Sequence, residues 1–180
     1  MAFSEPFPVL RKDPVLLRQI KPSDQIAVFQ GLSDPQVIRY YGVEYHSLAD
    51  TKAQMDWYQD IFRQGSGIWW AITREAVGDL IGTCGLYNLQ PQHRKAEIGY
   101  WLLPHYWGQG MMRLTLETVL AYGFEKLNLH RIEAYVETEN TASARLLQRM
   151  GFRHEGTQRD TEIKKGNFIS LDLFARLQES

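Results

Sequence analysis

The sequence contains a single cysteine, Cys84, among its 180 residues. One cysteine cannot form a disulfide within the chain or build a cysteine-rich zinc site. Cys84 lies in the apolar run LIGTCGLY, which favours a buried small side chain over a nucleophile, because the sequence places no base beside it. We therefore expect neither a disulfide scaffold nor a metal site.

Long apolar runs and an excess of one charge are also lacking. No stretch of about eighteen apolar residues occurs, so we expect no membrane-spanning segment. The N-terminal MAFSEPFPVLRKDP has no apolar signal-peptide core, which favours a cytoplasmic protein. The 20 basic and 21 acidic residues leave a net charge of -1, too little to attract nucleic acid or an anionic membrane as a partner.

What the sequence does contain is typical of one globular domain over residues 1–180. Its hydrophobic fraction of 44% is ordinary for a folded chain, and 180 residues suffice for one substantial core but are few for two. No repeat, low-complexity tract or linker interrupts the chain. We expect a monomer or a homodimer.

Local patterns predict an alternation of strands and helices. Strands are expected over residues 14–20, 68–73, 80–87, 95–103, 130–137, 152–164 and 167–177. Helices are expected from Ser23 or Asp24 to about Leu32, after Asp34, from Ser47 to the glycines at 65–67, over 110–127 and over 140–150. This order predicts a mixed α/β fold with a largely antiparallel sheet of about seven strands flanked by helices, not a doubly wound parallel sheet.

A glycine-containing turn stands out between the strand at 95–103 and the helix at 110–127. After Pro104 the chain reads HYWGQGMMR, and such a turn at a helix start directs several backbone N–H groups toward one place. Gly108 and Gly110 would let phosphate oxygens approach the backbone closely. The turn favours a pyrophosphate site, although a tight turn without a ligand would carry the same glycines.

Two other phosphate motifs do not fit this turn. A dinucleotide fingerprint, G-x-G-x-x-G, would need a third glycine where Arg113 stands, and it would open a parallel unit early in the chain. A P-loop would need Gly-Lys-Ser/Thr, which is missing. The turn therefore belongs to neither of these classes.

Four features in a fixed order carry a resemblance to a known family. They are a strand that contains Glu97, the glycine turn, the stretch LHRIEA, and ENTASARLLQRMGF. AEIGYWLLPHYWGQGMM and FEKLNLHRIEAYVETENTASARLLQRMGFRHEG resemble the GNAT N-acetyltransferase superfamily, most of all the branch of the RimJ and RimL ribosomal-protein N-terminal acetyltransferases. The resemblance extends over about residues 68–174. It implies a twisted sheet whose strands at 95–103 and 130–137 splay apart, with acetyl-CoA lying in the gap.

The resemblance also implies which residues would bind acetyl-CoA. Leu102 and Leu103 would offer main-chain groups to the pantetheine arm, and the side-chain amide of Asn140 would bond the same arm. The pyrophosphate would lie on the backbone N–H groups of Gly108, Gln109, Gly110, Met111, Met112 and Arg113. Asn140 equally fits the N-cap of the following helix, and one residue could serve both roles.

Acetyl transfer to an amine requires a neutral amine and a group that takes its proton. About a tenth of an α-amine is neutral at pH 7, against fewer than about one in a thousand lysine side chains, so an N-terminal substrate needs only a modest base. Glu97 matches the family position that supplies this base, directly or through water. The alternative is a surface glutamate on a half-exposed strand.

The departing thiolate also needs stabilisation or a proton. Many family members place a tyrosine in the last helix, but Leu147 occupies that position here and cannot donate. Ser143 matches the serine of RimL-like members and could bond the thiolate or relay a proton through water. It could equally be a small polar residue at a helix start. A thiolate of pKa near 8.5 is also a tolerable leaving group, so the reaction does not require a strong acid.

The acceptor side is the least defined by sequence. The family resemblance suggests that residues 35–62 wall the acceptor site, so Arg39, Tyr40 and Tyr41 are candidate substrate-binding residues, with core packing as the alternative. We expect an N-acetyltransferase acting on a primary amine, in the first place a protein N-terminal α-amine. The alternatives are a small-molecule amine (a polyamine, an antibiotic or an amino-acid analogue) and a non-catalytic acyl-CoA sensor, which Leu147 alone supports.

Overall fold

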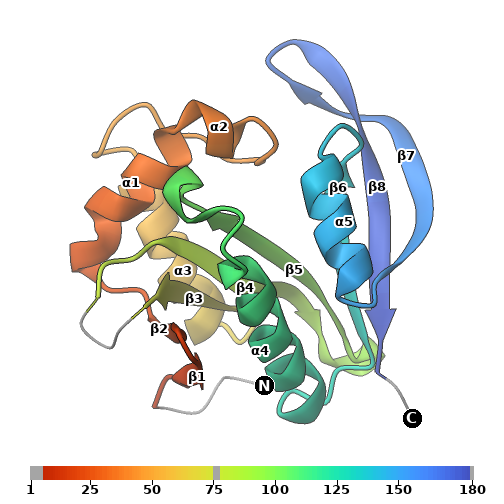
Figure 1. Cartoon of the computed structure of the whole chain (residues 1–180), viewed down its shortest axis with the longest axis horizontal. Helices are drawn as coiled ribbons and strands as arrows, with labels where there is room; N and C mark the ends of the chain where they lie inside the picture. The colour runs from red at the N-terminus through yellow and green to blue at the C-terminus, as the bar shows by residue number, and fades with distance from the viewer. Residues whose placement is uncertain (1–5, 75–77, 179–180) are drawn as a thin grey trace.

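Eight strands form one sheet in the order β1-β2-β3-β4-β5-β6-β8-β7 (Figure 1). The structure is a computed structural model that describes residues 6–74 and 78–178. The strands are β1 Leu10–Lys12, β2 Val15–Gln19, β3 Ile68–Thr73, β4 Gly82–Gln90, β5 Lys95–Leu102, β6 Arg131–Glu137, β7 Arg153–Lys164 and β8 Asn167–Leu177. All neighbouring pairs are antiparallel except β5 and β6, which are parallel. The predicted mixed α/β fold with a largely antiparallel sheet is confirmed.

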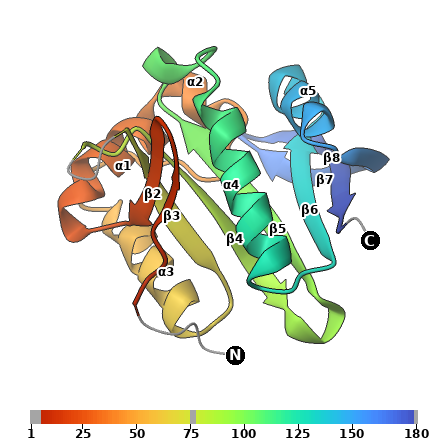
Figure 2. The same cartoon turned by 60° about the horizontal axis from the view of Figure 1, so that its bottom comes forward.

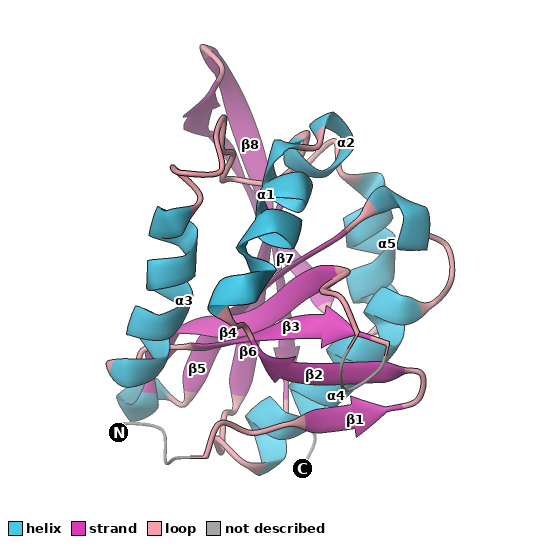
Figure 3. Ribbon diagram, turned by 90° about the vertical axis from the view of Figure 1, so that its left-hand side faces the viewer, coloured by secondary structure: helices cyan, strands magenta, loops and turns pink. Residues whose placement is uncertain are grey.

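Helices cover both faces of this sheet. Within the described residues the α-helices are α1 Gln25–Ser33, α2 Pro35–Ile38, α3 Lys52–Arg63, α4 Met111–Glu125 and α5 Thr141–Arg149. Helix α4 crosses in front of β4 and β5 in Figure 2, whereas α1 and α3 lie on the opposite face, as Figure 3 shows from the side. In residues 6–74 and 78–178, no helix has the length and apolarity needed to cross a membrane.

Strand β3 shows how one sheet supports two cores. All six of its residues are buried, because helices cover both sides of the sheet. Ile68, Trp70 and Ile72 belong to the core under α4, while Trp69 and Ala71 alternate with them into the core under α1 and α3. Cys84 is fully buried, as expected for a small apolar side chain.

Two sequence predictions differ from the structure. The hairpin partner β1 was missed, because three residues of mixed polarity carry no strand pattern of their own. The helix expected from Ser47 begins at Lys52 instead, because Ser47 caps a preceding turn in which its Oγ accepts a bond from the Asp50 N–H at 3.1 Å.

Glycine makes room for a tryptophan at the contact between α1 and β5. A Cβ atom on Gly31 would overlap the ring of Trp101, whereas a Cβ on Gly42 meets no atom within 4 Å. Overpacking of this kind costs about 1–3 kcal/mol, and the better helix propensity of alanine offsets at most about 1 kcal/mol. We expect Gly31→Ala to lower the free energy of unfolding measured by chemical denaturation, and Gly42→Ala to leave it nearly unchanged. Equal stability of the two variants would contradict this packing.

Candidate active site

The parallel strands β5 and β6 separate soon after they meet. They pair only where residues 95–97 of β5 face residues 131–133 of β6. Beyond this point β5 stays with β4 up to Leu102, and β6 stays with β8 up to Glu137. The splay implied by the resemblance is therefore present, and the facing edges of the two strands leave backbone groups without sheet partners.

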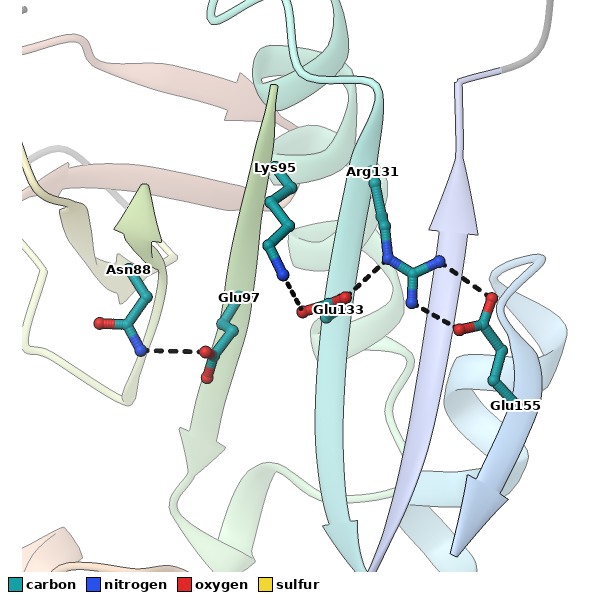
Figure 4. A network of polar contacts seen from close by, with 6 residues as sticks. All are labelled: Asn88, Lys95, Glu97, Arg131, Glu133 and Glu155. Atoms are coloured by element: carbon teal, nitrogen blue, oxygen red, sulfur yellow. Dashed lines mark hydrogen bonds and ion pairs between the residues drawn. The ribbon is translucent and has the colours of Figure 1, made fainter. Parts of the chain in front are cut away.

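A polar network holds the closed end of this gap (Figure 4). Glu133 of β6 is 7% exposed and accepts bonds from Lys95 Nζ at 3.4 Å and from Arg131 Nε at 2.6 Å. Arg131 also donates to Glu155 of β7 at 2.9 Å, and this guanidinium holds the pKa of the Glu155 carboxyl below its usual value. The network therefore joins β5, β6 and β7 below the point where the strands diverge.

Removing the buried member of this network should be costly. We expect Glu133→Ala to lower the free energy of unfolding by about 3 kcal/mol, because it leaves Lys95 and Arg131 facing a buried position without their carboxylate. Glu155→Ala is the matched control within the same network, and its loss should be much smaller because Glu155 is exposed and solvent screens its charge. Chemical denaturation measures both, and equal losses would contradict the role assigned to Glu133.

A wide cleft of about 1840 Å³ follows the gap and continues past it on both sides. Eleven of the predicted site residues line this cleft: Arg39, Tyr40, Tyr41, Leu102, Gly108, Gly110, Met111, Met112, Arg113, Asn140 and Ser143. Three do not, namely Glu97, Leu103 and Gln109. The structure thus brings together most, but not all, of the residues that the sequence singled out.

The glycine turn lies at the start of α4 and has the shape of an anion cradle. Gly108 and Gly110 adopt φ of +72° and +75°, in the left-handed region that favours glycine, and a Cβ atom on either would meet no protein atom within 4 Å. The first N–H groups of α4 have no acceptor within the helix, and they carry the positive end of its dipole. These residues fit a pyrophosphate, whose oxygens would fill the space left by the two absent side chains.

Two side chains of the turn hold it in place, one against β5 and one within the turn itself. Trp107 Nε1 donates to the Leu102 carbonyl at 2.7 Å, and Gln109 Nε2 donates to the His105 carbonyl at 2.8 Å. The Gln109 side chain therefore braces the turn, and Gln109 does not line the cleft.

Leu102 and Leu103 differ in what their main chains can offer. The Leu103 N–H donates to the Ile81 carbonyl at 2.9 Å, so it is already used by β4. In an antiparallel ladder the N–H and carbonyl of one residue point to the same edge of its strand, and those of the next residue point to the other edge. Because the Leu103 N–H points to β4, the Leu102 N–H points to the gap between β5 and β6. Of the two predicted pantetheine contacts, only Leu102 has a main-chain N–H directed toward the cleft.

Asn140 and Ser143 occupy the first turn of α5. Asn140 is the N-cap of this helix, and its Oδ1 accepts a bond from the Ser143 N–H at 3.2 Å. This bond uses the amide oxygen and leaves the amide NH₂ group to donate into the cleft. Leu147 is fully buried in the core one turn further on, so it can neither reach nor protonate a leaving group.

Glu97 lies at the vertex of the gap, beside the cleft rather than in its wall. Its Oε1 accepts a bond from Asn88 Nδ2 at 2.9 Å (Figure 4). Tyr87, which lines the cleft, lies next to it. Burial raises the pKa of Tyr87 well above its ordinary value, and the adjacent Glu97 carboxylate raises it further through its charge and as a hydrogen-bond acceptor. Tyr87 is therefore the neighbour of Glu97 on β4 that itself lines the cleft.

Aromatic side chains wall the opposite end of the cleft from the glycine turn. The ring of Trp69 lies 5.1 Å from that of Trp57 and 5.7 Å from that of Tyr87. Tyr41 and Tyr45 complete this end, and burial raises the pKa of both phenols. Sequence analysis missed most of these residues, because helical or strand spacing alone does not separate a core aromatic from one that faces a cleft.

The β7–β8 hairpin contacts the C-terminal end of α2 beside the aromatic end of the cleft. It extends past the rest of the sheet on the side of α2 (Figure 1). Lys164 near its tip donates to the Arg39 carbonyl at 2.6 Å and to Glu137 at 2.5 Å, and Lys165 forms an ion pair with Glu44 at 3.0 Å. Arg39 itself stacks over Tyr40, with the guanidinium carbon 5.0 Å from the ring centroid.

The splayed strands, the glycine turn and the two helices beside them define an acyltransferase fold. The GNAT acetyltransferase domain family matches residues 15–153, and this chain belongs to that family as an N-acetyltransferase. It is 40% identical over 170 residues to the uncharacterized N-acetyltransferase YoaA of Bacillus subtilis, and the match covers 94% of this chain and 96% of YoaA.

Two solved structures share the fold. RimL, a ribosomal L7/L12 alpha-N-protein acetyltransferase in complex with coenzyme A, superposes with a TM-score of 0.85 at 20% identity, over 94% of this chain and 98% of RimL. Spermidine N-acetyltransferase from Vibrio cholerae, in complex with CoA and spermine, superposes with a TM-score of 0.81 at 24% identity, over 93% and 97% of the two chains. The fold is therefore shared by proteins whose acceptors are a protein in one case and a polyamine in the other.

Proposed function

We propose that this chain transfers the acetyl group of acetyl-CoA to the α-amine at the N-terminus of a protein or peptide. The observation that carries the proposal is the cleft, which has an anion cradle at one end and an aromatic, nearly neutral wall at the other. Acetyl-CoA supplies an acetyl group activated as a thioester. The backbone from Gly108 to Arg113 would hold its pyrophosphate, and the Leu102 N–H and the Asn140 amide would hold its pantetheine arm.

Glu97 is the proposed base of this reaction. Its carboxylate is bonded to Asn88 and adjacent to Tyr87, so a proton from the amine would reach it through the Tyr87 hydroxyl or a water molecule. An indirect base of this kind suits an α-amine, of which about a tenth is already neutral at pH 7. It suits a lysine side chain poorly, because almost all of that amine is protonated.

The charges at the aromatic end of the cleft, where the amine acceptor would bind, favour a peptide over a polyamine. A polyamine carries several positive charges and would need several carboxylates without basic partners. Glu137 is paired with Lys164 and Glu44 with Lys165. Among the described residues near this end, this leaves Glu162 of the hairpin as the cleft-lining carboxylate with no basic side chain at ion-pair distance. One such carboxylate is too few for a polyamine. The exposed Arg39 guanidinium offers donors for peptide carbonyls instead.

Release of the CoA thiol in the presence of different amines tests this proposal. The panel contains peptides with free N-termini, the same peptides with blocked N-termini but intact lysines, spermidine and small amines. We expect release only with free N-termini, and mass spectrometry should place the acetyl group on the α-amine. Faster release with spermidine would support the polyamine alternative. Tight CoA binding without release for any amine would support the sensor alternative.

A further inference from the structure

A hydroxyl from β5 meets Ser143 across the cleft. Tyr100 OH lies 2.7 Å from Ser143 Oγ, which is a short hydrogen bond, and both residues line the cleft. Tyr100 belongs to the part of β5 that no longer pairs with β6, while Ser143 lies in the first turn of α5. The contact therefore joins β5 to α5, at a place where β5 no longer forms backbone hydrogen bonds with β6.

At 2.7 Å either hydroxyl can donate to the other, and the surroundings of Tyr100 keep it in the form that can donate. Burial raises the pKa of the Tyr100 phenol far above its ordinary value, because a phenolate would lose its hydration there. Tyr100 thus keeps its proton and can donate it to Ser143 Oγ. A serine hydroxyl has one hydrogen and two lone pairs, so a donor on one lone pair leaves the Ser143 hydrogen free to point elsewhere.

We propose that Tyr100 is a positioning residue, which donates to Ser143 Oγ and thereby directs the Ser143 hydroxyl hydrogen into the cleft toward the sulfur of the leaving thiolate. The inference rests on the proposed function. A donor behind Ser143 also polarises its O–H bond, so that Ser143 donates more strongly. Leu147 occupies the position where many family members carry a tyrosine and is buried in the core, whereas the phenol beside Ser143 belongs to β5.

The proton balance of the step does not involve Tyr100. The amine nitrogen forms a bond to the acetyl carbon, the carbon–sulfur bond breaks, and the sulfur leaves with the electron pair. The amine proton passes toward Glu97 and then to solvent, and the thiolate later takes a proton from solvent. Ser143 contributes a hydrogen bond to the negative sulfur, and Tyr100 keeps its own proton throughout.

The pKa of the CoA thiol, measured on bound CoA by the ultraviolet absorbance of its thiolate, tests the pair without turnover. We expect the wild-type protein to lower this pKa below its value in free CoA. Tyr100→Phe and Ser143→Ala should each raise it by about one unit, a tenfold change in the thiolate equilibrium, and the double variant should raise it no further. Tyr122→Phe, a tyrosine of α4 outside the cleft, is the matched control and should leave it unchanged.

Turnover provides a second readout. Tyr100→Phe and Ser143→Ala should each lower kcat about tenfold with little change in the KM of acetyl-CoA, and the losses should not multiply in the double variant. Ser143→Thr, which keeps a hydroxyl, should recover most of the rate. An unchanged thiol pKa in Tyr100→Phe, or fully multiplying losses, would overturn the inference. A folded wild-type protein that lowers the thiol pKa but acetylates no amine would refute the proposed function and leave the pair in place.

Discussion

Glu97→Gln is expected to lower kcat/KM for an N-terminal peptide about 100-fold near pH 6.5 and far less near pH 9. Near pH 6.5 most of the α-amine is protonated, so the reaction depends on a group that takes its proton; near pH 9 most of it is already neutral. Glutamine keeps the size of the side chain and can still accept the bond from Asn88. The change therefore removes a base and leaves the local structure in place.

The measurement is the pH profile of CoA-thiol release at subsaturating peptide. Glu125→Gln is the matched control, because Glu125 is an exposed carboxylate at the end of α4, away from the cleft. It should follow the wild-type profile at every pH. An equal loss at both ends of the profile for Glu97→Gln would mean that Glu97 does not take the proton.

Gly110→Val is expected to raise the Kd of acetyl-CoA about 10- to 100-fold. Two effects combine in this direction. A β-branched residue at φ +75° is strained, and its side chain would enter the space that the pyrophosphate is proposed to fill. A hydrogen bond to a charged group contributes about 1.5–3 kcal/mol, so losing one such bond already accounts for a change of this size.

Calorimetric titration with acetyl-CoA separates ligand binding from backbone strain when a matched glycine is included. Gly166 has φ of +81° in the β7–β8 turn, and a Cβ atom there also meets nothing within 4 Å. Gly166→Val should therefore destabilise the fold in the same way and leave the Kd of acetyl-CoA unchanged. Unchanged binding in Gly110→Val would remove the pyrophosphate from this turn.

Several features of the site could be predicted because they depend on neighbours in the chain. The glycine turn at the start of α4 is encoded by residues a few positions apart, and so is the N-cap bond from the Ser143 N–H to Asn140 Oδ1. The hairpin strand β1 and the start of α3 at Lys52 were predicted wrongly for the same local reason. Their patterns are too short or too polar to outweigh the turn chemistry beside them.

Side-chain contacts between segments distant in the chain have no comparable signal in the sequence. Tyr100 and Ser143 are 43 positions apart, and the alternation of β5 indicates only which face Tyr100 shares with its neighbours. The closeness of Tyr87 to Glu97 depends on the register of β4 against β5, in which these two residues face each other. Strand alternation does not specify register between strands, so neither pair could be derived from the sequence.

The sequence by itself determined the order of all the strands and helices after β1, the glycine turn at the start of α4 and the membership of an acetyltransferase family. Each of these rests on short-range spacing, on glycine and cap chemistry, or on a motif. Only the tertiary structure decided that Glu97 lies next to Tyr87, that the Leu103 N–H is used by β4, and that Tyr100 meets Ser143. The physical reason is that local spacing specifies elements and faces, whereas the register of strands and the crossing of helices over them specify which side chains touch.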